Sequence, residues 1–153
     1  MIFTPEHVRL IVEGLKTQTR RVVKSGEELR QWDVDTPMVY YVDDGWCGHE
    51  GPGPACYPGR VKWVVGRTYA VQPGRGKPAV ARIRITEIRR EKLMNISHAD
   101  AQAEGYEGIY ISDALPYADY TNFMDAWNAI NRRKGTRWSD NPLVWALTFE
   151  VVR

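Results

Sequence analysis

The sequence predicts one α+β domain built around a small mixed sheet or barrel. Its 153 residues suit a single core, and 43% hydrophobic with 26% charged residues is an ordinary globular composition. Several predicted strands follow one another without the regular helices of a parallel α/β sheet. We therefore treat residues 1–153 as one domain, with a long loop insertion at about 24–60.

The chain begins with a predicted helix over residues 4–14. Thr4 can cap it, Pro5 suits its first position, and Gly14 is a natural terminator. Helical spacing predicts one buried face, made of Val8, Ile11, Val12 and Leu15.

The segment KTQTRRVV, residues 16–23, predicts a strand because it alternates and is rich in β-branched residues. Period-two spacing puts four side chains on one face, namely Thr17, Thr19, Arg21 and Val23. Lys16 lies at the turn after Gly14, so the alternation leaves its direction open. Residues 24–60 are irregular and rich in Gly and Pro, with PMVYYV as a short strand, and the insertion could lie over a site.

The second half of the chain predicts further strands and two helices. Residues 61–72 give two short strands broken at Gly66, while 78–88 and 141–152 each give one longer strand. The segment ISHADAQAEG predicts a helix with Ser97 as cap, Asp100 in a capping-box position, Glu104 at its end and Gly105 as terminator. TNFMDAWNAIN predicts a second helix, capped by Thr121, whose buried face is Phe123, Ala126, Trp127 and Ile130.

The net charge of +2 favours no particular partner, but the basic residues are clustered. The clusters are Arg20, Arg21 and Lys24; Arg82, Arg84, Arg89, Arg90 and Lys92; and Arg132, Arg133, Lys134 and Arg137. Each can be a solvated face or a phosphate contact. No apolar run reaches the ~18 residues of a membrane span, and the N-terminus lacks a signal-peptide pattern. We expect no membrane partner and a cytoplasmic location, in a bacterium or a phage-infected host.

The loop segment CGHEGPGPAC holds three residues of types that bind zinc, Cys47, His49 and Cys56. Tetrahedral zinc needs a fourth ligand and no second close pair follows, so free thiols are the simpler interpretation. We therefore expect neither a metal nor another cofactor. His7, His49 and His98 lack motif context and are interpreted as surface histidines.

Lys16, Thr19 and Glu104 are the candidates for chemistry. A threonine hydroxyl needs an adjacent base to attack a carbonyl. Lysine can be that base only if its pKa falls well below about 10.4, and burial or a neighbouring cation such as Arg20 or Arg21 acts in that direction. Glu104 at a helix C-terminus has a tendency toward a raised pKa. From spacing alone, a surface lysine and a strand-forming threonine remain the simpler interpretation.

Taken together, IVEGLKTQTRRVV, VGRTYAVQ, ARIRITEIRREKLMNISHADAQAEG, FMDAWNAIN and NPLVWALTFEV resemble the ASCH family of the PUA-like superfamily. The similarity covers most of the chain and extends to phage- and prophage-encoded members. It implies a PUA-like small mixed β-barrel flanked by helices, with a cleft for a nucleobase or RNA. One bacterial branch of the family hydrolyses N4-acetylcytidine to cytidine and acetate.

The resemblance implies a metal-independent amidohydrolase acting on N4-acylated cytosine nucleosides. Its catalytic set falls on Lys16, Thr19 and Glu104, and its substrate-binding residues are Arg21, with Arg20 and Thr17 in support. The chain departs from the family at Arg67, where an aspartate is usual, and at Gln72, where phage-type members carry an acid.

Two other functions remain open. Trp32, Trp46 and Trp63 could stack bases in a non-catalytic RNA-binding module. The lysine and arginines could instead support metal-free cleavage of RNA by its own 2′-hydroxyl group.

Overall fold

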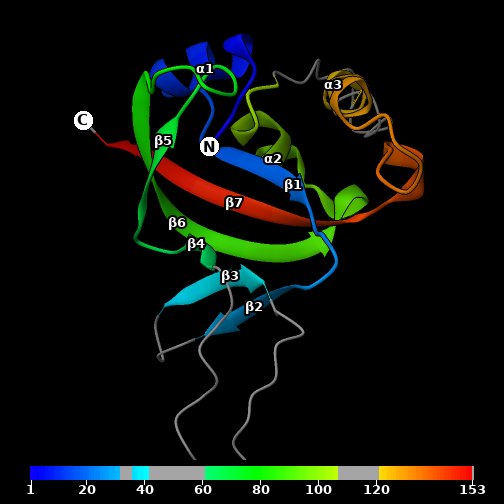
Figure 1. The fold of residues 1–153 in the computed structure, drawn as a ribbon. Coiled ribbons are helices and arrows are strands. Elements are labelled where there is room, and N and C mark those ends of the chain that lie inside the picture. Colours follow the sequence, from blue (N-terminus) through cyan, green and yellow to red (C-terminus); the bar gives the residue numbers. More distant parts are fainter. Residues whose placement is uncertain (32–35, 42–60, 107–120, 153) are drawn as a thin grey trace, which may run out of the picture.

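The computed structural model describes residues 1–31, 36–41, 61–106 and 121–152, and their strands form two antiparallel sheets (Figure 1). The larger sheet, in the order β1-β7-β6-β5, contains β1 (Gln18–Val22), β5 (Thr68–Val71), β6 (Ala81–Lys92) and β7 (Leu143–Val152). The smaller sheet, in the order β2-β3-β4, contains β2 (Glu27–Gln31), β3 (Pro37–Tyr41) and β4 (Val61–Val64). The helices are α1 (Pro5–Val12), α2 (His98–Ala103) and α3 (Thr121–Ile130), with 3₁₀ turns η1 (Leu93–Asn95) and η3 (Trp138–Asp140).

The α+β class is therefore confirmed, whereas the mixed barrel is not. Within the described ranges every pairing between named strands is antiparallel, and the two sheets do not close into a barrel. Strand β1 consequently remains at an edge of the larger sheet. No helix in these ranges is both long and apolar enough to cross a membrane.

Helix α1 starts as predicted but buries a narrower face. The Thr4 hydroxyl caps it by accepting the N–H of the first turn. Ile11 is fully buried against the larger sheet, but Val12 and Leu15 are 58% and 56% exposed. The prediction that these two residues are buried is wrong, because α1 covers one end of the sheet and only the Ile11 side faces it.

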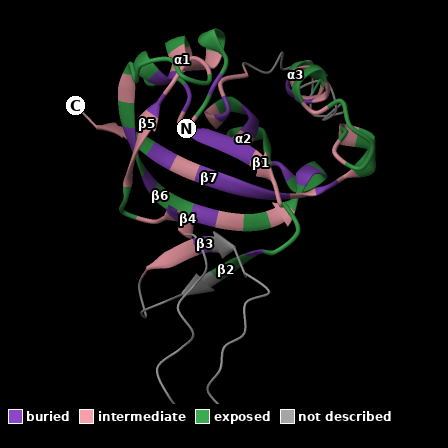
Figure 2. Ribbon diagram, in the orientation of Figure 1, coloured by how far each residue is buried: buried purple, intermediate pink, exposed green. Residues whose placement is uncertain are grey.

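The hydrophobic core is centred on β6 and β7, the two central strands of the larger sheet (Figure 2). Strand β6 alternates as predicted, with Ile83 and Ile85 buried, until a register shift between Ile85 and Glu87 makes Ile88 the next buried residue. In β7 four successive residues are buried, Val144, Trp145, Ala146 and Leu147. Both faces of β7 are covered, since Val144 packs with α3 while Trp145 packs with the smaller sheet.

The smaller sheet contains β3, the strand predicted at PMVYYV. It also contains β2, in a segment that the sequence predicts to be loop. A polar anchor attaches it to the larger sheet. The buried carboxylate of Glu27 accepts the indole N–H of Trp145 at 2.8 Å and pairs with Lys62 at 2.5 Å.

The ends of α2 and α3 define the region beside β1. Ser97 caps α2 as predicted, but the Asp100 carboxylate is bonded to arginines rather than completing a capping box. Thr121 is the first residue of α3, not its cap. Ile130 is 56% exposed, against prediction: it is the last residue of α3, and the core cluster includes Trp127 and Phe123, about one and two turns earlier, but does not reach Ile130.

Candidate active site

Lys16 and Glu104 form a buried ion pair. The Lys16 Nζ lies 2.5 Å from the Glu104 Oε2 and also donates to the Glu104 carbonyl oxygen at 2.7 Å. The Lys16 side chain is 0% exposed and that of Glu104 is 4% exposed. The turn after α1 thus points Lys16 inward, which strand alternation left open.

Three chain segments converge to make this pair. The N–H groups of Leu15 and Lys16 both donate to the Leu10 carbonyl oxygen, so the chain turns tightly at the end of α1. The Thr17 N–H donates to the Ala103 carbonyl oxygen at 2.8 Å, which fixes the start of β1 against the end of α2. These main-chain bonds set the side chains of residues 16 and 104 face to face.

The environment of Lys16 pulls its pKa in two directions. Burial lowers the pKa of Lys16, and the charges of Arg21 and Arg20 add to that lowering. The charge and hydrogen bond of Glu104 oppose it. The net direction is downward, as a reactive lysine requires.

Arg20 connects Glu104 to two further carboxylates. Its guanidinium lies 3.4 Å from Glu104 Oε1, 2.7 Å from Glu91 and 2.9 Å from Asp100. Arg89 also contacts Asp100, at 3.1 Å. Because the Arg20 side chain is fully buried, this network holds the Glu104 carboxylate in one place.

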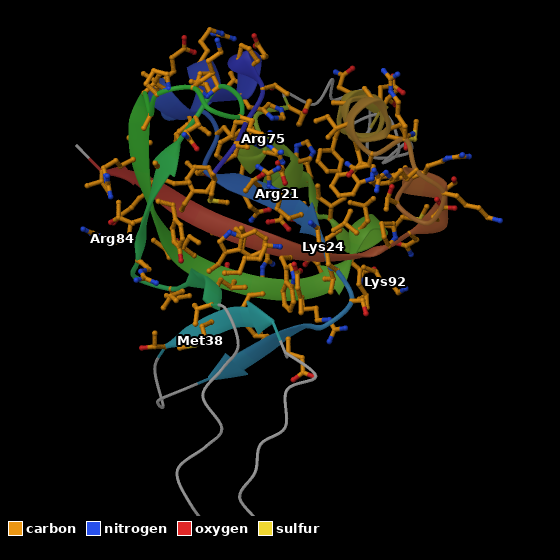
Figure 3. All side chains as sticks on the ribbon, viewed as in Figure 1. Arg21, Lys24, Met38, Arg75, Arg84 and Lys92 are labelled. Carbon is orange, nitrogen blue, oxygen red and sulfur yellow. The ribbon has the colours of Figure 1, made fainter. Side chains whose placement is uncertain are left out.

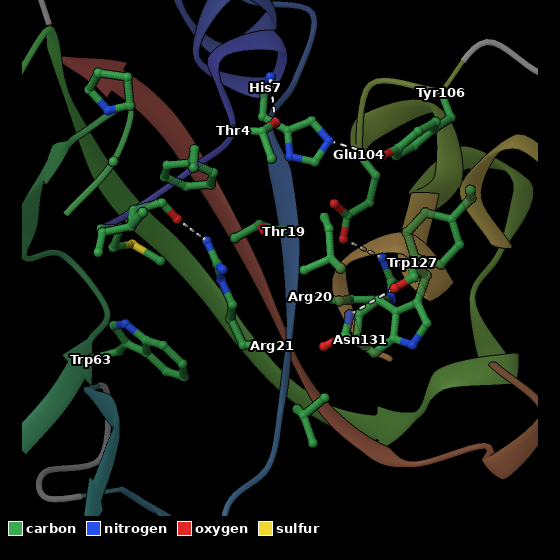
Figure 4. Close-up of a pocket in the computed structure, with 18 of the residues that line it drawn as sticks. Thr4, His7, Thr19, Arg20, Arg21, Trp63, Glu104, Tyr106, Trp127 and Asn131 are labelled. Atoms are coloured by element: carbon green, nitrogen blue, oxygen red, sulfur yellow. Dashed lines mark hydrogen bonds and ion pairs between the residues drawn. The ribbon is translucent and has the colours of Figure 1, made fainter. Parts of the chain in front are cut away.

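Thr19 and Arg21 lie on the opposite face of β1 from Arg20, as period two predicts. Thr19 is almost completely buried. Arg21 donates to the Ile2 carbonyl oxygen at 2.8 Å and lies over the Phe3 ring, 5.1 Å from its centroid. Burial lowers the pKa of Arg21, although Glu104 opposes this. Figure 4 shows Arg21 extending to one side of β1 and Arg20 to the other.

A pocket of about 940 Å³ runs along β1 and brings most of these residues together. Its lining includes Thr19, Arg20, Arg21 and Glu104, together with aromatic residues of α3. The pocket lining formed by the described residues includes neither Lys16 nor Thr17. Lys16 therefore meets the pocket through Glu104, and Thr17 contributes main-chain contacts.

His7 and Tyr106 also line this pocket, although no pattern in the sequence predicts a role for them there. The His7 Nε2 lies 2.8 Å from the Tyr106 hydroxyl, and the rings meet edge to face at 5.9 Å. Burial, helped by the charge of Lys16, lowers the pKa of His7 to about 4. Burial, helped by the charge of Glu104, raises the pKa of Tyr106 to about 12. The two groups are thus a neutral hydrogen-bonded pair at physiological pH.

The interpretation of His7 as a surface histidine is therefore wrong. Its half-buried position depends on a residue 99 positions away, and no local pattern in the sequence indicates that contact. His98 is exposed, as expected, and contacts Gln102.

The possible metal ligands Cys47, His49 and Cys56 lie outside the described residues, as do Trp32 and Trp46. Among the residues that are described, no group of three or more His, Cys, Asp or Glu side chains is placed to hold a metal ion.

Two solved structures share this arrangement of elements. An ASCH domain from Lactobacillus crispatus matches with a TM-score of 0.52, covering 95% of this chain and 70% of that one at 18% identity. The chain has an ASCH-like fold. A protein of the DUF984 family from Enterococcus faecalis shares the ASCH-like fold with a TM-score of 0.51, covering 96% of this chain and 70% of that one at 19% identity. No family model and no curated protein matches the sequence.

This likeness in fold agrees with the resemblance to ASCH proteins that the sequence motifs predict. At these identities the comparison concerns the fold alone. Any activity must therefore be argued from the site.

Proposed function

We propose that this chain is a metal-independent amidohydrolase that removes the acyl group from N4-acetylcytidine or a related N4-acylated cytosine nucleoside. The observation that carries the proposal is the buried Lys16–Glu104 pair, with Glu104 and Thr19 on the wall of one pocket. A buried lysine and carboxylate in direct contact can exchange a proton, and amide hydrolysis needs both a base and a proton donor.

In the first half-reaction the Thr19 Oγ1 attacks the acyl carbon. Its proton passes to the Lys16–Glu104 pair, in which the Lys16 amine is the base and Glu104 is the member that lines the pocket, and the oxyanion that forms is stabilised by Arg21. The bond from carbon to N4 then breaks, and the protonated Glu104 gives its proton to N4. Cytidine leaves, and the acyl group remains as an ester on Thr19.

The 2.5 Å contact between Lys16 and Glu104 resets the pair. After cytidine leaves, Lys16 is an ammonium and Glu104 a carboxylate, and one proton moving from Lys16 to Glu104 restores the starting forms. Burial disfavours two charges relative to this neutral pair. Water then attacks the ester, Lys16 carries a proton from water to the Thr19 oxygen, and the carboxylic acid is released.

Arg20 serves as a positioning residue in this scheme. It bonds Glu104, Glu91 and Asp100 and so fixes the carboxylate that faces the ligand.

The test is to incubate the purified protein with N4-acetylcytidine and follow cytidine by chromatography. Lys16→Ala and Thr19→Val are each expected to lower the rate by about 10²- to 10⁴-fold, whereas Lys134→Ala, an exposed cation away from the pocket, keeps it. Mass spectrometry of the quenched enzyme is expected to show an acylated Thr19; turnover without it means that Thr19 orients the attacking water instead. No release of cytidine from any N4-acylated cytidine would exclude the proposal.

Binding of RNA without chemistry is the second candidate. It is favoured by the cations Arg21, Lys24 and Lys62, which line the same pocket. Salt-dependent RNA binding that is the same in Thr19→Val, with no hydrolysis by either protein, would support it.

A further inference from the structure

His7 and Tyr106 are two polar groups of the pocket that the proposed reaction does not use. The charges of Lys16 and Glu104 both act on the pKa of His7, so the imidazole lies near the proposed reacting groups. Figure 4 shows the His7 ring directed into the pocket, with Thr19 and Glu104 beside it. A ligand that reaches Thr19 and Glu104 therefore also meets this imidazole.

The imidazole of His7 is uncharged at physiological pH. Burial lowers its pKa to about 4, and the charges of Lys16 and Arg21 add to this lowering. Among the cations labelled in Figure 3, Arg21 lies on β1 beside the pocket, whereas Lys92 lies at the distant end of β6. His7 also belongs to the first turn of α1, where the positive end of the helix dipole disfavours a cation. Because an imidazole with so low a pKa is a weak base, its main use to a ligand is a hydrogen bond.

The contact with Tyr106 selects the ring nitrogen of His7 that carries the proton. The His7 Nε2 lies 2.8 Å from the Tyr106 hydroxyl. If the hydroxyl donates, Nε2 accepts and the proton is on Nδ1. If Nε2 donates instead, the hydroxyl hydrogen and the Nδ1 lone pair are both left without a partner among the described residues. The first arrangement leaves one group free and the second leaves two, so Tyr106 favours the Nδ1–H form.

The His7 Nδ1 is open to a ligand. Within the described ranges, Arg89 Nε is the side-chain nitrogen or oxygen that is both sealed from solvent and without a hydrogen-bond partner. The His7 Nδ1 has no partner in these ranges either, so it is not sealed. The pocket wall thus carries a neutral N–H donor that the protein itself does not use.

We propose that the Nδ1–H of His7 binds a carbonyl oxygen of the ligand, and that Tyr106 is the positioning residue that keeps the proton there. In an N4-acylated cytidine this oxygen belongs either to the acyl group or to C2 of the base. A neutral donor suits an uncharged carbonyl group, since no ion has to leave water to make the bond. The identity of the ligand rests on the proposed function, whereas the position of the proton does not.

NMR of the full chain with ¹⁵N-labelled histidine locates this proton at pH 7, the His7 signals being assigned by their absence from His7→Gln. We expect a protonated Nδ1 and an unprotonated Nε2. Tyr106→Phe removes the hydroxyl and is expected to give a mixture of the two forms, a change that a packing role of Tyr106 would not cause. A protonated Nε2 in the wild type, or an unchanged proton position in folded Tyr106→Phe, would overturn the proposal.

Two substitutions of His7 test the donor itself. An asparagine amide places an N–H near the position of Nδ1, whereas a glutamine amide lies near the position of Nε2. His7→Asn is expected to keep the rate of cytidine release from N4-acetylcytidine within about threefold, and His7→Gln to lose more. A bond to the acyl oxygen predicts a fall in kcat of about 10²- to 10³-fold in His7→Gln with KM little changed, because the bond strengthens as the oxyanion forms. A bond to the C2 carbonyl predicts a rise in KM of about three- to tenfold with kcat kept.

The control is His98→Gln, since His98 is exposed and lies outside the pocket lining that the described residues form. Hydrolysis by folded His7→Gln at the wild-type rate, or equal losses in His7→Asn and His7→Gln, excludes the donor and leaves the proposed function standing.

If the wild type does not hydrolyse N4-acetylcytidine, the proposed function fails and calorimetric titration with N4-acetylcytidine and cytidine tests the donor. Weaker binding by His7→Gln than by His7→Asn supports the donor. An effect with both probes assigns the C2 carbonyl, and an effect with the acylated probe alone assigns the acyl oxygen. Equal binding by the two variants, or no binding of either probe, overturns it.

Discussion

Lys16 is the residue on which the proposed chemistry depends most. Moving an ammonium and a carboxylate out of water costs several kcal/mol for each ion, and their attraction does not always recover it. A buried pair of this kind contributes little net stability, and a buried ionisable pair of which Glu104 lines a pocket is a candidate for a functional role.

The first prediction separates stability from chemistry at this pair. Lys16→Met and Glu104→Gln each leave a buried group without its partner, and each is expected to lower the free energy of unfolding by about 3–5 kcal/mol. The double variant removes both charges and is expected to lose less than the sum of the single losses, while remaining inactive. Urea unfolding measures the first effect and cytidine release the second. Additive losses would contradict the direct coupling of the two side chains.

The second prediction concerns His7 and pH. Its pKa in the folded protein, about 4, lies below its ordinary value of 6.5, so the unfolded chain binds more protons between these values. Stability therefore falls as pH decreases through this window, by about 1–2 kcal/mol from this half-buried group once solvent screening is allowed for. His7→Gln should lack this part of the loss, and His98→Gln should retain it. Urea unfolding at pH 7 and pH 4.5 compares the variants, and identical pH dependence in His7→Gln and the wild type would contradict the assignment.

At the scale of single residues, the sequence predicts which side chains are candidates for the site but not how they are arranged in space. The GLKTQTRR motif and Glu104 were identified through the resemblance, and the structure brings Lys16 and Glu104 into contact. The inward direction of Lys16 depends on hydrogen bonds to Leu10 at the end of α1, and the His7–Tyr106 pair depends on tertiary folding. Neither has a signal in local spacing.

Among the elements, strand β1 and the end of α2 decide how the site is built. Glu104 is the C-cap residue of α2, and Gly105 follows it with a φ of +91°. A Cβ at Gly105 would lie 2.8 Å from the Leu10 Cδ1 and 3.5 Å from the Lys16 Cβ. Glycine there allows α1, β1 and α2 to meet closely.

The third prediction tests this close approach. Gly105→Ala is expected to lose about 1–2 kcal/mol from its left-handed backbone and about 1 kcal/mol more from the contact with Leu10. Gly76→Ala is the matched control, because its φ is +73° but nothing lies within 4 Å of the added Cβ. Urea unfolding of the two variants gives the difference. Equal losses would show that the α1–α2 contact does not need glycine.

Element positions were largely predictable, because alternation and capping are local properties. The starts of α1 and α2 and the strands β3, β4, β5 and β7 follow the predicted segments closely, whereas β6, predicted over 78–88, extends over Ala81–Lys92. Side-chain exposure was less predictable: Val12, Leu15 and Ile130 carry the helical spacing of a buried face but are exposed. Which side of a helix is covered depends on its neighbours, and these are set by the tertiary fold.

At the scale of the whole molecule, the smaller sheet has to be held against the larger one. Glu27 of β2 supplies a polar link between them through Trp145 of β7, while its ion pair with Lys62 of β4 lies within the smaller sheet. Burial acts to raise the pKa of Glu27, but the hydrogen bonds from Lys62, the Lys24 N–H and Trp145 outweigh it and lower the pKa. This link is therefore strongest as a carboxylate, and its contribution is lost as pH falls below the ordinary glutamate value.

The fourth prediction follows from this link. Glu27→Ala is expected to destabilise the protein by about 3 kcal/mol, since it leaves the buried indole N–H of Trp145 without its acceptor and removes the ion pair with Lys62. Hydrogen exchange in β2–β4 should accelerate more than exchange in β6 and β7. Glu150→Ala is the control, because its ion pair with Arg84 is exposed and lies within the larger sheet. Equal acceleration in both sheets would mean that Glu27 does not act as a local link.

The ASCH-like fold by itself leaves the reaction undecided, because one fold supports many functions. The central claim is that Glu104, held by Lys16 and Arg20, donates a proton to the amine that leaves N4-acylated cytidine. It depends on the contacts of a few side chains rather than on overall topology.

The most direct measurement is the initial rate of cytidine release from N4-acetylcytidine by the wild type and by Glu104→Gln, with the folded fraction of each checked by circular dichroism. Our account predicts turnover by the wild type and a fall of about 10²- to 10⁴-fold in folded Glu104→Gln, which cannot give up a proton. Release at equal rates by the two folded proteins, or no release by the wild type, would contradict it.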